Sequence, residues 1–364
     1  MTRRVFILGA GSSAAFQGTK GNCPTISDFF IRADQIGLLN KYKEQTMSRP
    51  LFDFVRQEFG VKKADLCRVP VNIESVITRL EEKIEYFDTY GKYTIRGQRR
   101  RNEKAVRLYG MRLQVTTFIG HVLLELTHNS LSPLHVKLAD GFTDSDTVIS
   151  FNYDLLMDYA LEHKKKWFPN SGYRIAFKQV IEHDKFLPLI TTSELGIPYL
   201  KLHGSLNWLH GISPYRILFN TPAPTGEDIF LLRSINHEII PGPMDIAGKH
   251  EYTENNIYYD LHSLLIAPLK DKPYSSMPKA LLSLWDLAAN AMKMADELIL
   301  IGYSIPESDT KSRGLIQQAK KGHPVLSLVD INPNPVIERL ESLLKYKPSF
   351  VYNSFQDYVN AIKV

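Results

Sequence analysis

The sequence predicts an α/β protein built on a parallel sheet, with helices on both faces and a large helical insertion. The first observation is a set of short apolar runs without alternation, which is typical of strands buried on both faces. These runs lie in the segments 4–8, 146–154, 197–205, 297–304 and 325–333. The second observation is that about 100 residues of helical periodicity separate the first run from the next, where a plain βαβ unit has only a short crossover.

The first run leads directly into a glycine turn. Residues 5–8 are apolar, and Gly9, Ala10, Gly11, Ser12 and Ser13 follow. Two glycines let the backbone turn sharply and approach a ligand closely. Ser12 or Ser13 is a suitable cap for a following helix, whose free N–H groups favour an anion. The stretch predicts a cradle for a pyrophosphate, with an ordinary tight turn between strand and helix as the alternative.

The chain between and after the strands divides into regions of different character. Residues 36–140 have apolar residues at helical spacing, as in 73–84 and 113–126, and form the predicted insertion between a core of 1–35 and 141–364. Helices are expected at 155–163 and 278–295, and the segment after 335 reads as helix, a short strand at 350–352, and helix. The segment 211–265 is predicted to be irregular, with loops and small strands, because five prolines fall within residues 211–260.

Composition limits the class of protein. The 364 residues carry a net charge of +5, and the two cysteines, Cys23 and Cys67, cannot build a disulfide framework or a four-cysteine zinc site. No apolar run reaches the roughly 20 residues of a membrane span, and no signal peptide is recognised. We therefore expect a cytoplasmic protein without a metal. The basic run 96–104 is more typical of a solvated helix end than of a nucleic-acid site, so any contact with nucleic acid is expected to be indirect.

Parallel strands bring their carboxyl ends to one edge, where ligands bind in a crevice. Asn152 and Asp154 follow the second run, and His203 follows the third. Asn152 is a candidate for holding a ribose hydroxyl or a water, with Asp154 supporting its loop; a turn closed by an Asx side chain is the alternative. His203 is a candidate general base, because a neutral imidazole accepts a proton near neutral pH, although a lone histidine is more often a structural hydrogen-bonder.

The last two runs end in further candidates. Gly302 and Ser304 are suited to the approach of a ribose or phosphate, with a simple turn as the alternative. Asn332 is suited to the adenosine end, with a turn before Pro333 as the alternative. Gly9, Gly11 and Ala14 also match a dehydrogenase fingerprint. That fingerprint needs a second strand within about 30 residues, ending in an acidic residue. Because a loop and helices follow instead, hydride transfer is disfavoured.

In order and in placement, this set resembles the sirtuin superfamily, and in particular its bacterial branch from anti-phage defence systems. The resemblance covers the Rossmann-like part of the chain and implies binding of NAD+ as substrate. It implies these roles: Gly9, Ala10, Gly11 and Ser12 at the pyrophosphate; Asn152, supported by Asp154, at the nicotinamide ribose and the attacking group; His203 as catalytic base; Gly302, Ser304 and Asn332 at the adenosine side; and Asp28 with Phe29 in the loop over nicotinamide.

Two departures from the deacetylase pattern shape the expected activity. Phe30 stands where an arginine is expected after the loop phenylalanine, and residues 204–300 contain no cysteine for a zinc ribbon. The resemblance therefore implies an NAD+ hydrolase that releases nicotinamide and ADP-ribose. A protein deacylase and a non-catalytic NAD- or ADP-ribose-binding subunit are the alternatives. The resemblance also implies a homo-oligomer built through the insertion. It further implies a second defence protein as partner, either a HerA-type ATPase, which is favoured, or an Argonaute-like protein.

Overall fold

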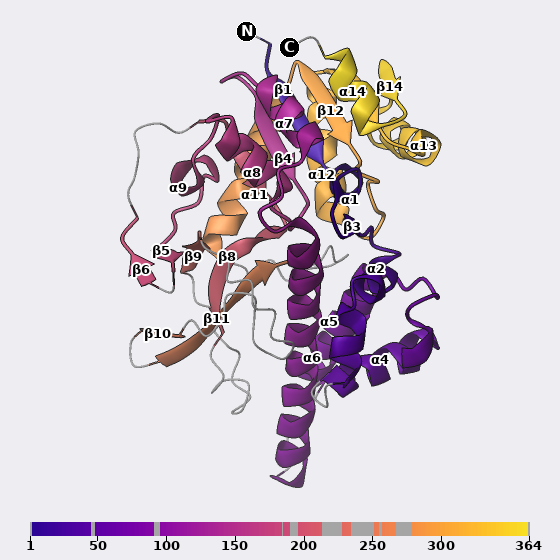
Figure 1. The fold of residues 1–364 in the computed structure, drawn as a ribbon, viewed down its shortest axis with the longest axis vertical. Helices are drawn as coiled ribbons and strands as arrows, with labels where there is room; N and C mark the ends of the chain where they lie inside the picture. The colour runs from indigo at the N-terminus through magenta and orange to yellow at the C-terminus, as the bar shows by residue number, and fades with distance from the viewer. Residues whose placement is uncertain are drawn as a thin grey trace.

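The centre of the molecule is a six-stranded, fully parallel sheet (Figure 1). The computed structural model describes residues 2–44, 48–90, 95–183, 185–189, 196–212, 228–233, 251–254, 257–266 and 278–362. Across the sheet the strands are β14 (Phe350–Tyr352), β13 (Val325–Val329), β12 (Glu297–Ile301), β1 (Arg4–Leu8), β4 (Thr147–Ser150) and β7 (Tyr199–Lys201). All five predicted runs are strands of this sheet, and the predicted short strand at 350–352 is its edge.

This strand order is that of a Rossmann-like fold. From β1 the chain adds β4 and then β7 on one side, and later adds β12, β13 and β14 on the other. The order therefore reverses between β1 and β12. In open α/β sheets, ligands bind outside the carboxyl ends of the strands at such a reversal.

Helices cover both faces of the sheet, as the sequence predicts. One layer contains α7 (Pro133–Asp140), α8 (Leu156–His163) and α14 (Phe355–Ala361); the other contains α11 (Lys279–Met294), α12 (Thr310–Gln318) and α13 (Pro333–Leu344). The four-residue α9 (Pro169–Gly172) follows α8. The strands β1, β4, β7 and β12 are buried almost throughout, because apolar side chains from both layers pack on them, whereas Phe350 and Val351 on the edge strand β14 are exposed.

A second sheet contains the described parts of the segment 211–265, where the sequence predicts loops with small strands. Its order is β10 (Glu251–Glu254), β11 (Ile257–Leu265), β8 (Gly204–Ile212), β9 (Ile229–Leu232), β5 (Val180–Glu182) and β6 (Lys185–Leu187). All neighbours are antiparallel except β5 and β9. The strands β8 and β11 are nine residues each, longer than the small strands expected, and they pair over most of their length through non-local hydrogen bonds. A two-stranded ribbon, β2 (Gln17–Gly18) and β3 (Gly21–Asn22), lies after the first turn.

A helical lobe with its own apolar core is inserted between β1 and β4. It contains α2 (Phe29–Gln35), α3 (Leu38–Glu44), α4 (Arg49–Phe59), the 3-10 turn η2 (Lys63–Asp65), α5 (Ile73–Tyr90) and α6 (Ile95–Thr127). Figure 1 shows α6 running away from the sheet beside α5. The apolar core of this lobe begins at Phe29 and reaches Leu126, whereas Leu138 and Ala139 on α7 pack in the core of the main sheet. The domain boundaries 36–140 stay a prediction.

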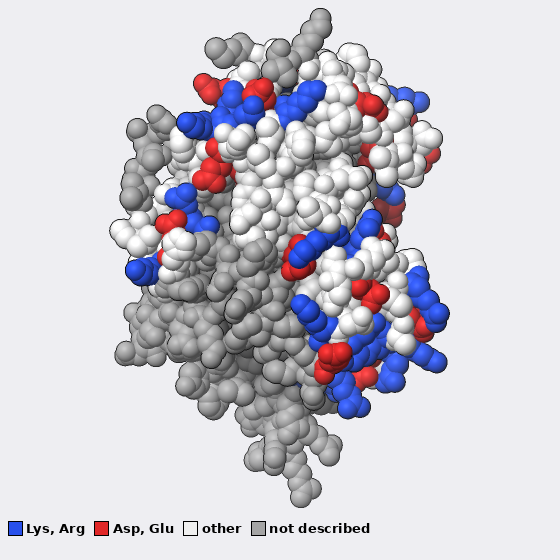
Figure 2. Space-filling model, in the orientation of Figure 1, with Lys and Arg blue, Asp and Glu red and all other residues white. Residues whose placement is uncertain are grey.

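Charged side chains of both signs are interleaved on the helical lobe (Figure 2). Glu58 lies 2.9 Å from both Arg79 and Lys83. Such exposed pairs each contribute roughly 0–1 kcal/mol to the free energy of folding, so they make this face hydrophilic but add little to its stability. The side chains of the basic run 96–104 lie outside the described ones. In the part of the chain that the structure describes, no helix is long and apolar enough to cross a membrane.

The buried His135 gives the fold a dependence on pH. Ser132 caps α7, and its Oγ lies 2.8 Å from His135 Nδ1. Desolvation lowers the pKa of His135 from 6.5 to about 4. The unfolded chain therefore binds the proton first, and stability falls as the pH drops from 6.5 towards 4, by up to about 1.4 kcal/mol per pH unit.

We expect His135→Gln, whose amide can also contact Ser132, to lose this component of the pH dependence. Urea unfolding of both proteins at pH 7 and pH 5 measures the difference, and the carboxylates contribute equally to both. Equal losses of stability between pH 7 and pH 5 in the two proteins would show that His135 is not the group responsible.

Candidate functional site

Two glycine turns interlock at the point where the strand order reverses. A Cβ on Gly302 would lie 2.3 Å from Ser12 N, and a Cβ on Gly11 would lie 2.7 Å from Gly302 Cα. Gly11 N donates to Gly302 O at 2.9 Å, and Gly9 N donates to Ile301 O at 3.0 Å. The glycines therefore let the turn after β1 pack directly on the turn after β12.

The helix after the first turn begins earlier than predicted. α1 (Ala10–Ala14) has Gly9 at its N-cap and no side-chain cap, so Ser12 and Ser13 lie inside the helix and do not cap it. The reason is the tightness of the glycine turn, which brings Ala10 into the first helical position. Because Gly11 N binds Gly302 O and Ser12 N binds Gly9 O, two of the N–H groups expected at the pyrophosphate are used within the protein.

Asn152 fastens the loop after β4 to this glycine turn. Its Nδ2 lies 2.9 Å from Gly9 O, 3.1 Å from Ser12 Oγ and 2.9 Å from Ser13 Oγ. Ser13 Oγ in turn donates to Asp154 Oδ2 at 2.6 Å. Asn152 and Asp154 are both more than nine-tenths buried. The structure thus brings together the predicted residues of the first two strand ends, and Asp154 Oδ1 also accepts from Leu156 N at 3.1 Å within the loop.

A buried lysine supports the same loop from the next strand. Lys201 is fully buried on β7, and its Nζ donates to Asp154 O at 2.5 Å and to Asp158 Oδ2 at 3.1 Å. Asp158 also accepts from the hydroxyls of Tyr173 and Tyr199. A buried charge is tolerated when its hydrogen bonds are satisfied, so this network fixes the position of the loop that carries Asn152.

His203 stands at the next strand end in an equivalent position. Ser150 on β4 pairs with Lys201 on β7, and Asn152 and His203 each follow two residues later. β4 and β7 are neighbours in the sheet, so the two residues follow adjacent strand ends at the same edge. Gly204 has φ +85, and a Cβ there would lie 1.9 Å from Leu264 O, so only glycine permits the turn from His203 into β8.

Aromatic rings surround His203. Its ring centroid lies 4.9 Å from that of Phe151 and 6.4 Å from that of Trp285. Phe151 stacks on Tyr303 at 4.4 Å, and Tyr303 packs against Gly9. Only 5% of His203 is exposed. The imidazole therefore lies in a nearly dry setting that is linked by packing to the glycine turns.

Asp309 is a site residue that the sequence analysis missed. Its Oδ2 lies 3.1 Å from His203 Nε2, and its side chain is 1% exposed. It is the N-cap of α12, where Oδ1 accepts from Ser312 N at 3.1 Å. Burial alone would raise its pKa, but the bond and charge of His203, with the Ser312 contacts, outweigh it and hold the pKa at about 2. The only sequence signal is an Asp three residues before a Ser, which is a helix-capping pattern.

The other predicted residues lie apart from this cluster. Ser304 and Asn332 are exposed, and Asn332 N donates to Asp330 Oδ1 at 2.8 Å, which is the turn given as the alternative. Asp28 accepts from Thr25 N at 2.6 Å and closes a turn before α2. Phe29 differs from expectation: it packs on Phe118 in the core of the helical lobe, because the helix that follows Asp28 turns it inward.

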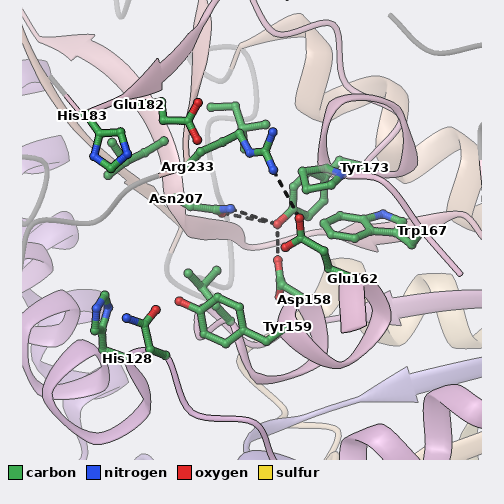
Figure 3. A pocket seen from close by; sticks show the side chains of 15 residues that line it. His128, Asp158, Tyr159, Glu162, Trp167, Tyr173, Glu182, His183, Asn207 and Arg233 are labelled. Atoms are coloured by element: carbon green, nitrogen blue, oxygen red, sulfur yellow. Dashed lines mark hydrogen bonds and ion pairs between the residues drawn. The ribbon is translucent and has the colours of Figure 1, made fainter. Parts of the chain in front are cut away.

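A cavity of about 600 Å³ lies elsewhere, between α8 and the second sheet (Figure 3). Glu162 and Arg233 form an ion pair at its edge, and Asp158, Tyr173 and Asn207 form its polar wall. None of its lining residues is a predicted site residue. Within the described residues, no group of three or more His, Cys, Asp or Glu is arranged to hold a metal ion.

The chain is similar to several solved structures. They include a Sir2 homolog in complex with NAD (12% identity, TM-score 0.40, covering 98% of this chain and 85% of that chain). A Sir2Tm structure with a propionylated peptide has 12% identity and a TM-score of 0.37, with coverages of 98% and 89%. A Sir2 complex with a p53 peptide and NAD+ has 12% identity and a TM-score of 0.35, with coverages of 98% and 90%. No protein-family model and no curated protein matches the sequence.

Proposed function

We propose that this chain is a sirtuin-like NAD+ hydrolase that releases nicotinamide and ADP-ribose. The observation that carries the proposal is the equivalent placement of Asn152 and His203 at neighbouring strand ends. Asn152 also contacts the glycine turn, where the strand order reverses. An amide and an imidazole beside a glycine turn are the groups needed to orient a water and to take up a proton next to a bound dinucleotide.

Each of the two residues has one defined part in the proposed chemistry. The Nδ2 of Asn152 is engaged by Gly9 and the two serines, so its Oδ1 is the atom left to accept a hydrogen bond from water or a ribose hydroxyl. His203 takes the proton from that water or hydroxyl. The rings of Phe151, Tyr303 and Trp285 exclude solvent, which strengthens the electrostatic stabilisation of the positive charge that develops on the ribose.

Hydrolysis is favoured over deacylation by the segment that follows His203. Residues 204–300 have no cysteine, and the chain enters β8, which pairs with β11, directly after Gly204. An antiparallel sheet therefore occupies the part of the chain in which deacetylating sirtuins usually carry a zinc ribbon. We therefore propose that this chain does not frame an acyl-lysine peptide and that water is the acceptor.

We expect the purified chain to release nicotinamide and ADP-ribose in equal amounts from NAD+, at the same rate with and without an acetyl-lysine peptide. Chromatography of the products measures both. Release that requires the peptide would support the deacylase alternative instead. Tight binding of NAD+ without release would support the non-catalytic alternative.

We further propose that this activity serves anti-phage defence by depleting NAD+. The support for this role is the resemblance of the motif set. The activity must be inhibited in the absence of infection, because unchecked hydrolysis of NAD+ would harm the host. The restraint is proposed to come from a homo-oligomer and a second protein, with a HerA-type ATPase favoured over an Argonaute-like protein. The native mass of the chain, alone and mixed with the proteins encoded beside it, tests this assembly.

A further inference from the structure

The strongest unassigned feature of the site is the buried pair of His203 and Asp309. Their side chains are 6% and 1% exposed, and Nε2 lies 3.1 Å from Oδ2. Isolated buried charges are costly, so a carboxylate at this depth needs a partner for each oxygen. Oδ1 serves the cap of α12, and Oδ2 faces the imidazole.

We infer that Asp309 is a positioning residue for His203: its Oδ2 lies 3.1 Å from Nε2, and alignment of the imidazole with this carboxylate lets Oδ2 accept Nε2–H and makes Nδ1 the basic nitrogen. The inference rests on the proposed function. A neutral imidazole has one donor nitrogen and one acceptor nitrogen, and the bond made by one of them sets the other. The structure thereby assigns the atom that takes the proton from water or the ribose hydroxyl. The ring becomes an imidazolium, and Asp309 stays ionised beside it.

Asp309 itself is held rigidly, as a positioning group must be. Ser312 N donates to Oδ1, and Ser312 Oγ donates to Asp309 O at 3.0 Å. Tyr303 donates to the same Ser312 hydroxyl at 2.6 Å. Tyr303 lies against the glycine turn, so the start of α12 is fixed to β12 and to the turn after β1.

Two variants separate the role of Asp309 as helix cap from its role at His203. Asp309→Asn keeps an oxygen for Ser312 N but presents an amide N–H₂ to Nε2, which moves the imidazole proton to Nδ1. Asp309→Ser keeps a capping hydroxyl and offers Nε2 no partner. Ser354→Ala removes the N-cap of α14, which accepts from Asp357 N, and serves as the control for loss of a cap.

The readout is the tautomer of His203 in the ¹⁵N spectrum of histidine-labelled full-length protein. The signal is assigned among the 11 histidines by its loss in His203→Ala. We expect Nε2–H in the wild type and in Ser354→Ala, and Nδ1–H in Asp309→Asn. We also expect kcat for NAD+ to fall about 10²-fold or more in both Asp309 variants, with KM changed by less than about threefold.

The tautomer tests the pairing of His203 with Asp309, and the release of nicotinamide tests the proposed function, independently of each other. Nδ1–H in the wild type, or the same tautomer in the wild type and Asp309→Asn, overturns the assignment whether or not NAD+ is cleaved. A shifted tautomer with an unchanged kcat also overturns it, because the pairing would then not serve the reaction. A wild type that releases no nicotinamide refutes the proposed function, and the spectrum still decides the pairing.

Discussion

His203→Ala is expected to lower the rate of NAD+ cleavage by about 10²–10⁴-fold, because the base that takes the proton is lost. The change also removes the imidazole that faces Asp309 Oδ2, so one oxygen of this buried carboxylate loses its partner. We therefore expect a lower thermal stability as well. Hydrolysis of etheno-NAD, followed by fluorescence, measures the rate, and circular dichroism confirms that the protein remains folded.

Two further variants test whether the loss of cleavage rate is specific to the imidazole of His203. His203→Asn retains an N–H for Asp309 and should recover stability without recovering cleavage. His135→Gln changes another histidine that is fully buried, on α7, and should cleave at the wild-type rate at neutral pH. If His203→Ala hydrolyses etheno-NAD as fast as the wild type, His203 is not the base and the proposed mechanism is wrong.

The parallel sheet was predictable because its strands are buried on both faces. Such strands are continuous apolar runs, and their ends carry Gly, Asn, Asp or His. β1, β4, β7, β12 and β13 follow these runs, and the spacing of the helical insertion was visible as apolar periodicity. The convergence of Asn152 with the glycine turn follows from the same logic, because parallel strands end at one edge.

The second sheet and Asp309 were not predictable for a shared reason: both depend on contacts between residues distant in sequence. β8 pairs with β11, which lies about 50 residues later in the sequence, and the local sequence between them indicates small strands and loops but not which strands pair. Asp309 lies eight residues beyond the end of β12, so a search of strand ends overlooks it. Only the fold shows that the start of α12 returns to His203. Phe29 shows the reverse error, since a motif position proved to be part of an apolar core.

Gly302→Ala is expected to cost about 2–5 kcal/mol of stability. Gly302 has φ +60, which costs a residue with a Cβ about 1–2 kcal/mol. Its Cβ would also lie 2.3 Å from Ser12 N and 2.4 Å from Gly11 C, so the two turns must separate. Separation breaks the bond from Gly11 N to Gly302 O and leaves buried polar groups without partners, at roughly 1–3 kcal/mol.

Variants of two other glycines separate the contribution of backbone strain from that of the steric clash. Gly60 has φ +70 with nothing within 4 Å of an added Cβ, so Gly60→Ala carries the backbone strain alone, about 1–2 kcal/mol. Gly314 lies within α12 with the same open space and no positive φ, so Gly314→Ala should stabilise the protein by about 1 kcal/mol. Urea unfolding ranks the three variants. If Gly302→Ala costs no more than Gly60→Ala, the turns after β1 and β12 are not locked together. The glycines at 9, 11 and 302 would then have to be explained by a ligand rather than by packing.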